Sequence, residues 1–180
     1  IAQSVVVGEA YRVAYLHERG LAPGEPRPPG TEHERYVPVE PLIDLGTQIG
    51  PHEELLHLPA APAEDSPEKR AGERIAEVLE RAQIFNLSGV RVLDRRGCVV
   101  ATSGGERGRC LTPLAEVQLA LAGEYASKAR YRMPANPLPP LGGIQRRGQL
   151  RVFTALPIFD AGEVIGIVTA SRTGLDALSS

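Results

Sequence analysis

The chain has 180 residues, of which 42% are hydrophobic, and a formal net charge of −2, a length and balance typical of one globular domain with its own core. It contains no run of the roughly 18 apolar residues that a membrane-spanning helix needs. Its five tyrosines and three phenylalanines do not alternate with basic runs, which argues against a nucleic-acid-binding surface.

A helix is predicted over residues 1 to about 20. Apolar residues recur there at helical spacing, and Gly20 suits the position just after a helix C-terminus. The stripe comprises Val6, Ala10, Val13 and His17, with Val7, Tyr11 and Ala14 beside it. The chain starts without Met inside this pattern and ends in the polar tail TGLDALSS, so we expect a domain within a longer protein.

Residues 21 to 66 are rich in proline and acidic side chains and show no clear periodicity. Within them, residues 37 to 58 carry too much apolar surface to leave in water, so we expect an ordered wrap over the core. Four potential metal ligands lie in this wrap: His52, Glu53, Glu54 and His57. Their spacing is loose and exposed loop residues are the commoner explanation, so no metal site is predicted.

A second helix is predicted from Pro67, with Ser66 as its N-cap. One face carries an apolar stripe, and charged residues cover the rest. The stripe comprises Ala71, Ile75, Val78, Leu79, Ala82 and Phe85. This pattern is typical of an amphipathic helix packed on a core.

Two hairpins of matching construction are predicted. Apolar strands flank Asp94-Arg95-Arg96-Gly97 in the first, and LRVFTALPI and EVIGIVTAS flank Phe159-Asp160-Ala161-Gly162 in the second. An aspartate and a closing glycine suit a type I turn followed by a glycine with positive φ in a bulge. Together the hairpins indicate an antiparallel sheet.

Between the hairpins, a short helix is predicted from Thr112-Pro113 to Gly123, followed by a strand over residues 125 to 133 and a loop over residues 134 to 148. Three glycines precede the short helix, in the arrangement of a phosphate cradle: Gly104, Gly105 and Gly108. No lysine follows in the required place, so a flexible link explains them more simply.

Three segments carry a family resemblance: VRVLDRRGCVVATSG, LAGEYASKARYR and RVFTALPIFDAGEVIGIVTASRT. They place a long helix before a five-stranded antiparallel sheet, with a short helix after the second strand. This arrangement over residues 67 to 173 resembles the Cache, or PhoQ-DcuS-CitA, family of extracytoplasmic sensor domains of bacterial membrane-bound histidine kinases. The resemblance implies a PAS-like α+β fold whose helices pack on one face of the sheet.

The resemblance also implies the domain organisation. Residues 1–180 form a single sensor domain. We expect an N-terminal helix (1–20), a Pro-rich wrap (21–66), a PAS-like core (67–173) and a tail leading to a membrane helix (174–180). No catalytic residue and no cofactor are expected in such a domain.

Charge is distributed unevenly along the chain. Residues 91 to 151 carry eleven Lys or Arg against four Asp or Glu. The sheet-forming half is therefore basic, which indicates an anion site or a face held against anionic lipid headgroups. A solvated face with outward-pointing arginines is the simpler alternative.

In the family that the sequence resembles, a small ligand lies over the central strands beneath a loop, here residues 134 to 148. The candidate ligand-binding residues are Arg130, Tyr131 and Arg132 on the third strand and Arg151 and Thr154 on the fourth. Guanidinium pairs bind carboxylates bidentately, so the expected ligand is a small anion such as an organic acid. In the alternative, strand alternation points the arginines to solvent and packs Tyr131 in the core.

Cys98 and Cys110 are the only cysteines. If the domain faces the periplasm, a disulfide between them is possible. Two separate thiols, with Cys98 buried in its strand, are the alternative.

The resemblance further implies a homodimer in the intact receptor, with Val6, Ala10, Val13 and His17 at the contact. The domain is expected on the periplasmic side of the inner membrane, between two membrane helices. The same fold in a chemoreceptor or a cyclase receptor is the first alternative. A small solute-binding protein or enzyme is the second.

Overall fold

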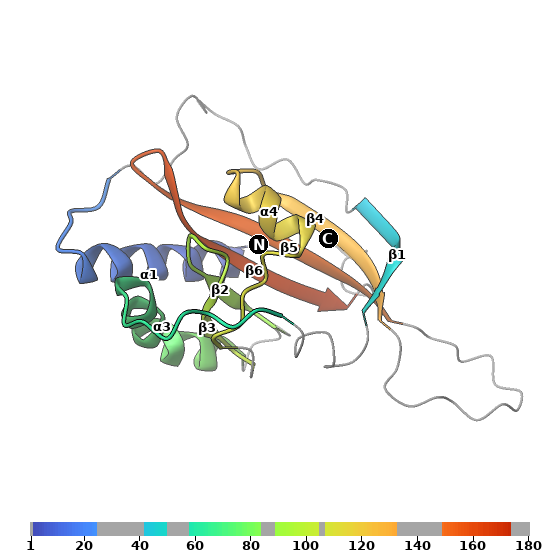
Figure 1. Ribbon diagram of the computed structural model, residues 1–180, viewed down its shortest axis with the longest axis horizontal. Helices are drawn as coiled ribbons and strands as arrows, with labels where there is room; N and C mark the ends of the chain where they lie inside the picture. Colours follow the sequence, from blue (N-terminus) through green and yellow to red (C-terminus); the bar gives the residue numbers. More distant parts are fainter. Residues whose placement is uncertain are drawn as a thin grey trace, which may run out of the picture.

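The computed structural model describes residues 2–24, 42–49, 58–83, 89–104, 107–132 and 149–173. These residues form, in chain order, α1 (Ala2–Glu18), β1 (Leu42–Ile49), α3 (Pro67–Gln83), β2 (Arg91–Leu93), β3 (Val99–Thr102), α4 (Ala115–Leu121), β4 (Ala126–Arg132), β5 (Gln149–Asp160) and β6 (Glu163–Thr173). The fold class is α+β, with one sheet and helices packed on it, as predicted (Figure 1).

The strands lie in the order β1-β4-β5-β6-β2-β3. The five from β4 to β3 pair antiparallel, which confirms the predicted sheet. A sixth strand, β1, was not predicted: residues 42–49 were expected to wrap over the core, but they pair in parallel with the edge strand β4. Parallel pairing joins segments that are far apart in the chain, so no turn sequence next to β1 indicates that residues 42–49 pair with β4.

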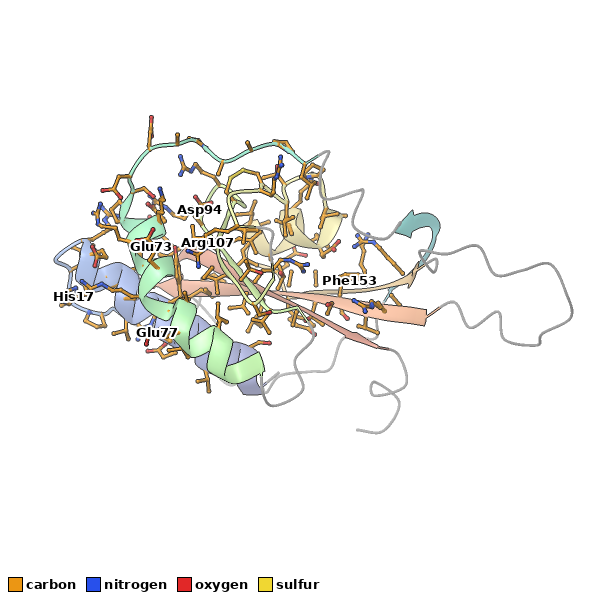
Figure 2. The ribbon with its side chains drawn as sticks, turned by 90° about the horizontal axis from the view of Figure 1, so that it is seen from below. His17, Glu73, Glu77, Asp94, Arg107 and Phe153 are labelled. Carbon is orange, nitrogen blue, oxygen red and sulfur yellow. A yellow bond between two sulfur atoms is a disulfide. The ribbon has the colours of Figure 1, made fainter. Side chains whose placement is uncertain are left out.

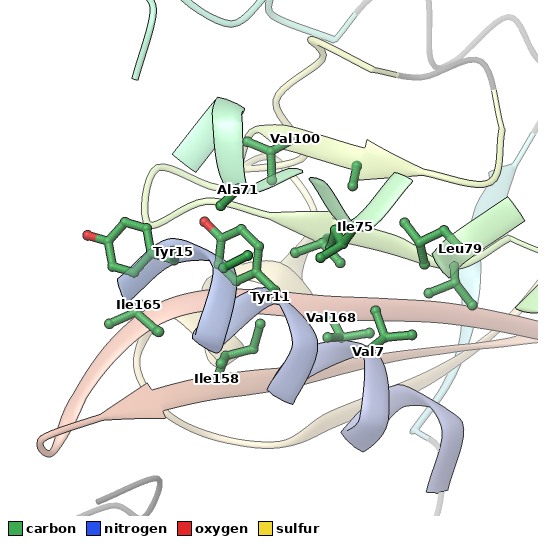
Figure 3. Packing of buried hydrophobic residues seen from close by; sticks show 14 of the residues in the cluster. Val7, Tyr11, Tyr15, Ala71, Ile75, Leu79, Val100, Ile158, Ile165 and Val168 are labelled. Atoms are coloured by element: carbon green, nitrogen blue, oxygen red, sulfur yellow. The ribbon is translucent and has the colours of Figure 1, made fainter. Parts of the chain in front are cut away.

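The helices cover both faces of the sheet, which corrects the expectation of helices on one face. On one face, α1 and α3 enclose a core that includes Tyr11, Ile75 and Val168 (Figure 3). On the other face, α4 encloses a second core that includes Val117 and Ile167. Val168 and Ile167 are adjacent on β6, and adjacent strand residues point to opposite faces. The two cores are therefore separated by the sheet.

The buried side of α1 is formed by Val7, Tyr11 and Tyr15, while Val6 and Val13 remain 64% and 50% exposed. On α3, the predicted stripe is buried at Ala71, Ile75 and Leu79. Val78 is an exception, with 43% exposure. The side chains of Ala82 and Phe85 lie outside the described residues.

A glycine sets the distance between α3 and the sheet. A Cβ built on Gly72 would lie 2.4 Å from the backbone oxygen of Val100 in β3, far inside van der Waals contact. Only a residue without a side chain permits this approach. The position of α3 on β3 therefore depends on Gly72.

Three of the four helix ends predicted from the sequence are confirmed by the structure. The Ser66 hydroxyl accepts a hydrogen bond from the Lys69 backbone N–H at 3.2 Å, as an N-cap does. Gly20 and Gly123, with φ of 64° and 92°, follow the ends of α1 and α4 as expected. The predicted Thr112-Pro113 start of α4 is wrong, because the helix begins at Ala115 with no side-chain cap at Leu114.

The first hairpin turn is as predicted. Gly97 has φ of 75°, and its N–H donates to the carbonyl of Asp94 at 2.9 Å. The β5–β6 turn differs in type. Gly162 has the expected positive φ of 80°, but Ala161 has φ of 47° as well, between the paired residues Asp160 and Glu163. Two positive φ values define a type I′ turn, whose twist matches that of the flanking strands without a bulge at the turn.

Cys98 and Cys110 form a disulfide in the structure, so they are not two separate thiols. The bridge fixes the segment that leads into α4 to the start of the β3 strand. His52, Glu53, Glu54 and His57 lie outside the described residues, as does Gly105 of the glycine segment. Among the residues that are described, no group of metal-ligating side chains is found, and no helix is long and apolar enough to cross a membrane.

Candidate functional site

Strand register places polar side chains in rows across the face of the sheet that carries α4. Lys128 on β4, Phe153 on β5 and Ser171 on β6 form one row. The next row outward contains Arg130 and Arg151, directly opposite each other. These positions alternate with the residues that pack under α1, so they share one face.

A third row lies closer to the apolar core under α4. Register aligns Ala155 on β5 with Thr169 on β6 and with Arg91 on β2. The row beyond it is apolar, with Ile167 beside Leu93 in the core that α4 covers. The face thus changes from apolar to basic within a few residues along each strand.

We define the polar patch as Arg91, Lys128, Arg130, Arg151, Thr169 and Ser171 on this face of β2, β4, β5 and β6. Figure 2 shows its neighbour Phe153 well along the sheet from the end where His17 of α1 and Glu73 of α3 lie. The patch is therefore separate from the α1 and α3 core.

Parts of the patch are deeply buried although they are polar. Thr169 and Ser171 are 7% and 3% exposed. The Thr169 hydroxyl makes no hydrogen bond with the described part of the chain. Such a group costs free energy unless a partner is supplied, on the order of 1–3 kcal/mol. A ligand with a hydrogen-bond acceptor or donor would supply one.

Gly89 brings the backbone close to the patch. Its φ is 82°, and a Cβ built there would lie 2.7 Å from the Ser171 hydroxyl oxygen and 3.9 Å from Nη1 of Arg91. A side chain at residue 89 would therefore fill the space between Ser171 and Arg91. Glycine therefore permits the close approach of residue 89 to Ser171.

One carboxylate enters the patch from α4. Glu116 accepts two hydrogen bonds of 2.5 Å from Nη1 and Nη2 of Arg130. Both side chains are buried, at 4% exposure for Arg130 and 3% for Glu116, and the Phe153 ring lies 5.4 Å from the guanidinium carbon. The bidentate geometry offsets the cost of removing two charges from water.

The electrostatics of the patch favour an anion. Four basic side chains share one face, and Arg130 and Arg151 are cross-strand partners, an arrangement in which like charges repel. Glu116 neutralises the charge of Arg130. Guanidinium and ammonium groups such as those of this patch are the donors that bind carboxylate or phosphate oxygens.

Three of the five predicted ligand residues have described side chains: Arg130, Arg151 and Thr154. Arg130 and Arg151 are brought together, as expected. Thr154 is wrong as a third member, because it alternates with Phe153 and lies on the α1 face, where its hydroxyl donates to the carbonyl of Ala170 at 3.4 Å. Tyr131 and Arg132 belong to β4, but their side chains lie outside the described residues.

Sequence reasoning missed Arg91, Lys128, Thr169, Ser171 and Glu116. Four of them lie on correctly predicted strands, and the missing information was the register that aligns those strands. Glu116 lies on the short helix, and a charged side chain is ordinarily expected to be exposed, so its burial was not predicted. A single polar residue among the apolar ones on the inner side of that helix was the available signal.

No protein-family model matches the sequence, and no curated protein matches it. In structure, the chain is similar to the sensor domain of the histidine kinase DctB of V. cholerae, with a TM-score of 0.43 and 19% identity over 57% of this chain and 37% of that one. It is also similar to an extracellular ligand-binding receptor of Desulfohalobium retbaense, with a TM-score of 0.39 and 15% identity over 56% of this chain and 18% of that one. The chain thus spans well under half the length of either structure.

Proposed function

We propose that this chain is the ligand-sensing domain of a bacterial membrane-bound histidine kinase of the Cache type, that it faces the periplasm, and that it binds a small carboxylate at the polar patch. The observation that carries the proposal is the set of basic side chains on one face of the sheet, three of them from neighbouring strands β4 and β5. Buried hydroxyl groups of β6 lie in the same rows.

The disulfide supports the proposed location. Disulfides persist in oxidising compartments such as the bacterial periplasm and are rare in the cytosol. Cys98 and Cys110 are bridged, in agreement with a domain outside the inner membrane. Anchoring by membrane helices on both sides of the domain is part of the same proposal.

Signal transmission would proceed by a population shift. A ligand that binds one arrangement of the sheet more tightly favours that arrangement. The central strands β5 and β6 also carry α1 on their other face, through Ile158 and Val168 against Val7. A change at the patch would therefore move β6 relative to α1, each of which leads toward a membrane helix in the proposed receptor.

The α1 surface fits a dimer in the intact receptor. Val6 and Val13 are 64% and 50% exposed, and the His17 side chain is 69% exposed. These positions share one side of the helix, with Ala10 between them. We propose that this side contacts a second copy of the chain.

A thermal-shift experiment tests the proposed ligand class. Acetate, glutarate, citrate and inorganic phosphate are added separately to the protein. A ligand that binds only the folded state stabilises it by about 2.7 kcal/mol at a hundredfold excess over Kd. At least one probe is expected to raise the melting temperature of the wild type, and Arg151→Ala should remove the shift.

Arg70→Ala is the matched control, because it removes the same charge from α3 on the other side of the molecule. Its probe-induced shift should equal that of the wild type. No shift with any probe, or the same shift in Arg151→Ala as in the control, would contradict the proposed function. The alternatives of a chemoreceptor or cyclase receptor share the binding step and differ in the output domain. A solute-binding protein or enzyme differs in having no attached output.

A further inference from the structure

The Glu116–Arg130 pair connects the polar patch to α4, the helix that covers this face of the sheet in the described part of the chain. Glu116 lies in the first turn of α4, and Arg130 lies on β4, the strand that follows. Val117, the next residue after Glu116, is fully buried in the core beneath the helix. Glu116 and Val117 share the first turn of α4, so we expect the start of α4 to move when the carboxylate of Glu116 leaves Arg130.

Neighbouring elements confine that movement to a short stretch. The disulfide holds Cys110, shortly before the helix, to Cys98. After the helix, Gly123 takes a positive φ of 92° and the chain enters β4. A displaced α4 would therefore turn between these two points.

The same pair already satisfies the chemistry expected of a ligand. Arg130 is held by both oxygens of a carboxylate, in the geometry that an incoming carboxylate would use. Arg151 is the cross-strand partner of Arg130 and lies in the same row of the sheet. An external carboxylate that reaches this row meets an arginine whose two terminal nitrogens are already occupied.

We propose that Glu116 is an internal competitor for Arg130, which an external carboxylate displaces on binding, so that α4 moves away from the sheet when ligand binds. This inference rests on the proposed function, since it concerns the same site. It identifies α4 as the element of the fold that responds first to the ligand. It also means that the affinity for ligand is lower than the basic patch alone would give, because part of the binding free energy is used to release Glu116.

Glu116→Gln tests the competition. The glutamine is nearly isosteric but has no charge, and its amide group presents hydrogens toward the guanidinium. The affinity for the carboxylate that gave the largest thermal shift, measured by isothermal titration calorimetry, should rise at least fivefold. Glu124→Gln is the matched control, because it makes the same change of net charge at an exposed residue just after α4; its affinity should change less than twofold.

Hydrogen exchange of the wild-type protein provides a second test that does not depend on the folding of a variant. Saturation with the same carboxylate should speed exchange of the backbone amides of residues 115 to 121, while those of α1 exchange at their former rates. Unchanged or slower exchange in α4 on saturation overturns the proposal.

The possible results separate the two proposals. Equal or weaker affinity in a folded Glu116→Gln protein overturns the competition and leaves the proposed function in place. Binding of no probe by either protein overturns both. If Glu116→Gln does not fold, the exchange rates of α4 in the wild type decide.

Discussion

Arg12 of α1 and Asp160 at the end of β5 are 148 residues apart in the chain and are joined by a hydrogen bond of 2.7 Å. The same carboxylate oxygen accepts from the backbone N–H of Gly24, and Arg12 also donates to the Gly24 carbonyl. Arg12 is further held by Glu9, whose pKa it lowers through their side-chain hydrogen bond. The N-terminal helix, the segment after it and the β5–β6 turn therefore meet at one charged group.

Asp160→Asn should reduce the free energy of unfolding by on the order of 2 kcal/mol, because it removes one charge from a pair whose side chains are 8% and 10% exposed. Glu9→Gln is the matched control, since Glu9 pairs with the same arginine but is 49% exposed. It should cost less than about 1 kcal/mol. Equal losses of unfolding free energy for the two variants in urea would show that the buried contact to the turn contributes no more to stability than the exposed pair.

Two helical glycines should respond oppositely to alanine. Gly72→Ala would place a Cβ 2.4 Å from a backbone oxygen of Val100, and a backbone cannot yield cheaply. It should destabilise the protein by on the order of 2 kcal/mol or more. Gly8→Ala, in α1, meets only side-chain carbons of Val168 and Ile158, at 3.4 and 3.5 Å. It should be neutral or stabilising by up to about 1 kcal/mol, because alanine favours helix. Thermal melts of both variants that shift in the same direction would contradict this account of α3 packing.

Stability should fall at high pH because of Tyr11. Burial, the largest cause, raises the pKa of its hydroxyl well above the ordinary value of 10.0, with the carboxylates of Glu68 and Asp94 acting in the same direction. The unfolded chain therefore releases this proton at a lower pH than the folded one. The contribution is complete below pH 10 and is lost as the pH rises toward the folded pKa.

Tyr11→Phe isolates this effect, since the Tyr11 hydroxyl of the wild type makes no hydrogen bond with the described residues. The difference in unfolding free energy between wild type and variant should be constant below pH 9. At pH 11 it should shift by about 1.4 kcal/mol against the wild type. A difference that stays constant up to pH 11 would show that Tyr11 ionises equally in both states.

The dimer proposed for the intact receptor predicts a periodic pattern of crosslinks along α1. Single cysteines at Val6, Ala10, Val13 and His17 in the full-length protein should form disulfide-linked dimers, because Val6, Val13 and His17 are exposed and the half-buried Ala10 lies between them on the helix. Cysteines at Val7 and Tyr11, which are buried against the sheet, serve as controls and should not. Uniform or absent crosslinking would contradict the proposed contact.

The elements were predictable wherever the chain carries its own local signals. Ser66 and Gly20 mark helix ends, and Gly97 and Gly162 mark turns, so the strands and helices of residues 67 to 173 follow from the sequence. The contribution of β1 was not predictable, since a parallel edge strand has no turn that joins it to its partner.

The site was predictable only in part, because it depends on register. Arg130 and Arg151 were found together since both stand out as basic residues on strands that pair. The position of Thr154 on the other face follows from strand alternation once Arg151 is placed, since the two residues are three apart on one strand. The pairing of Glu116 with Arg130 requires the position of a helix over the sheet, which no short stretch of sequence encodes.

The binding of a small carboxylate at the polar patch is tested most directly by the arginine side-chain Nε–H signals in NMR spectra. The protein is titrated with the carboxylate that gives the largest thermal shift. The signals of Arg91, Arg130 and Arg151 should move in a saturable way, with one shared Kd. Those of Arg12 and Arg70, which are held by carboxylates on the other side of the sheet, should not move. Saturable shifts confined to Arg12 and Arg70, or no saturable shift of any arginine, would contradict the account.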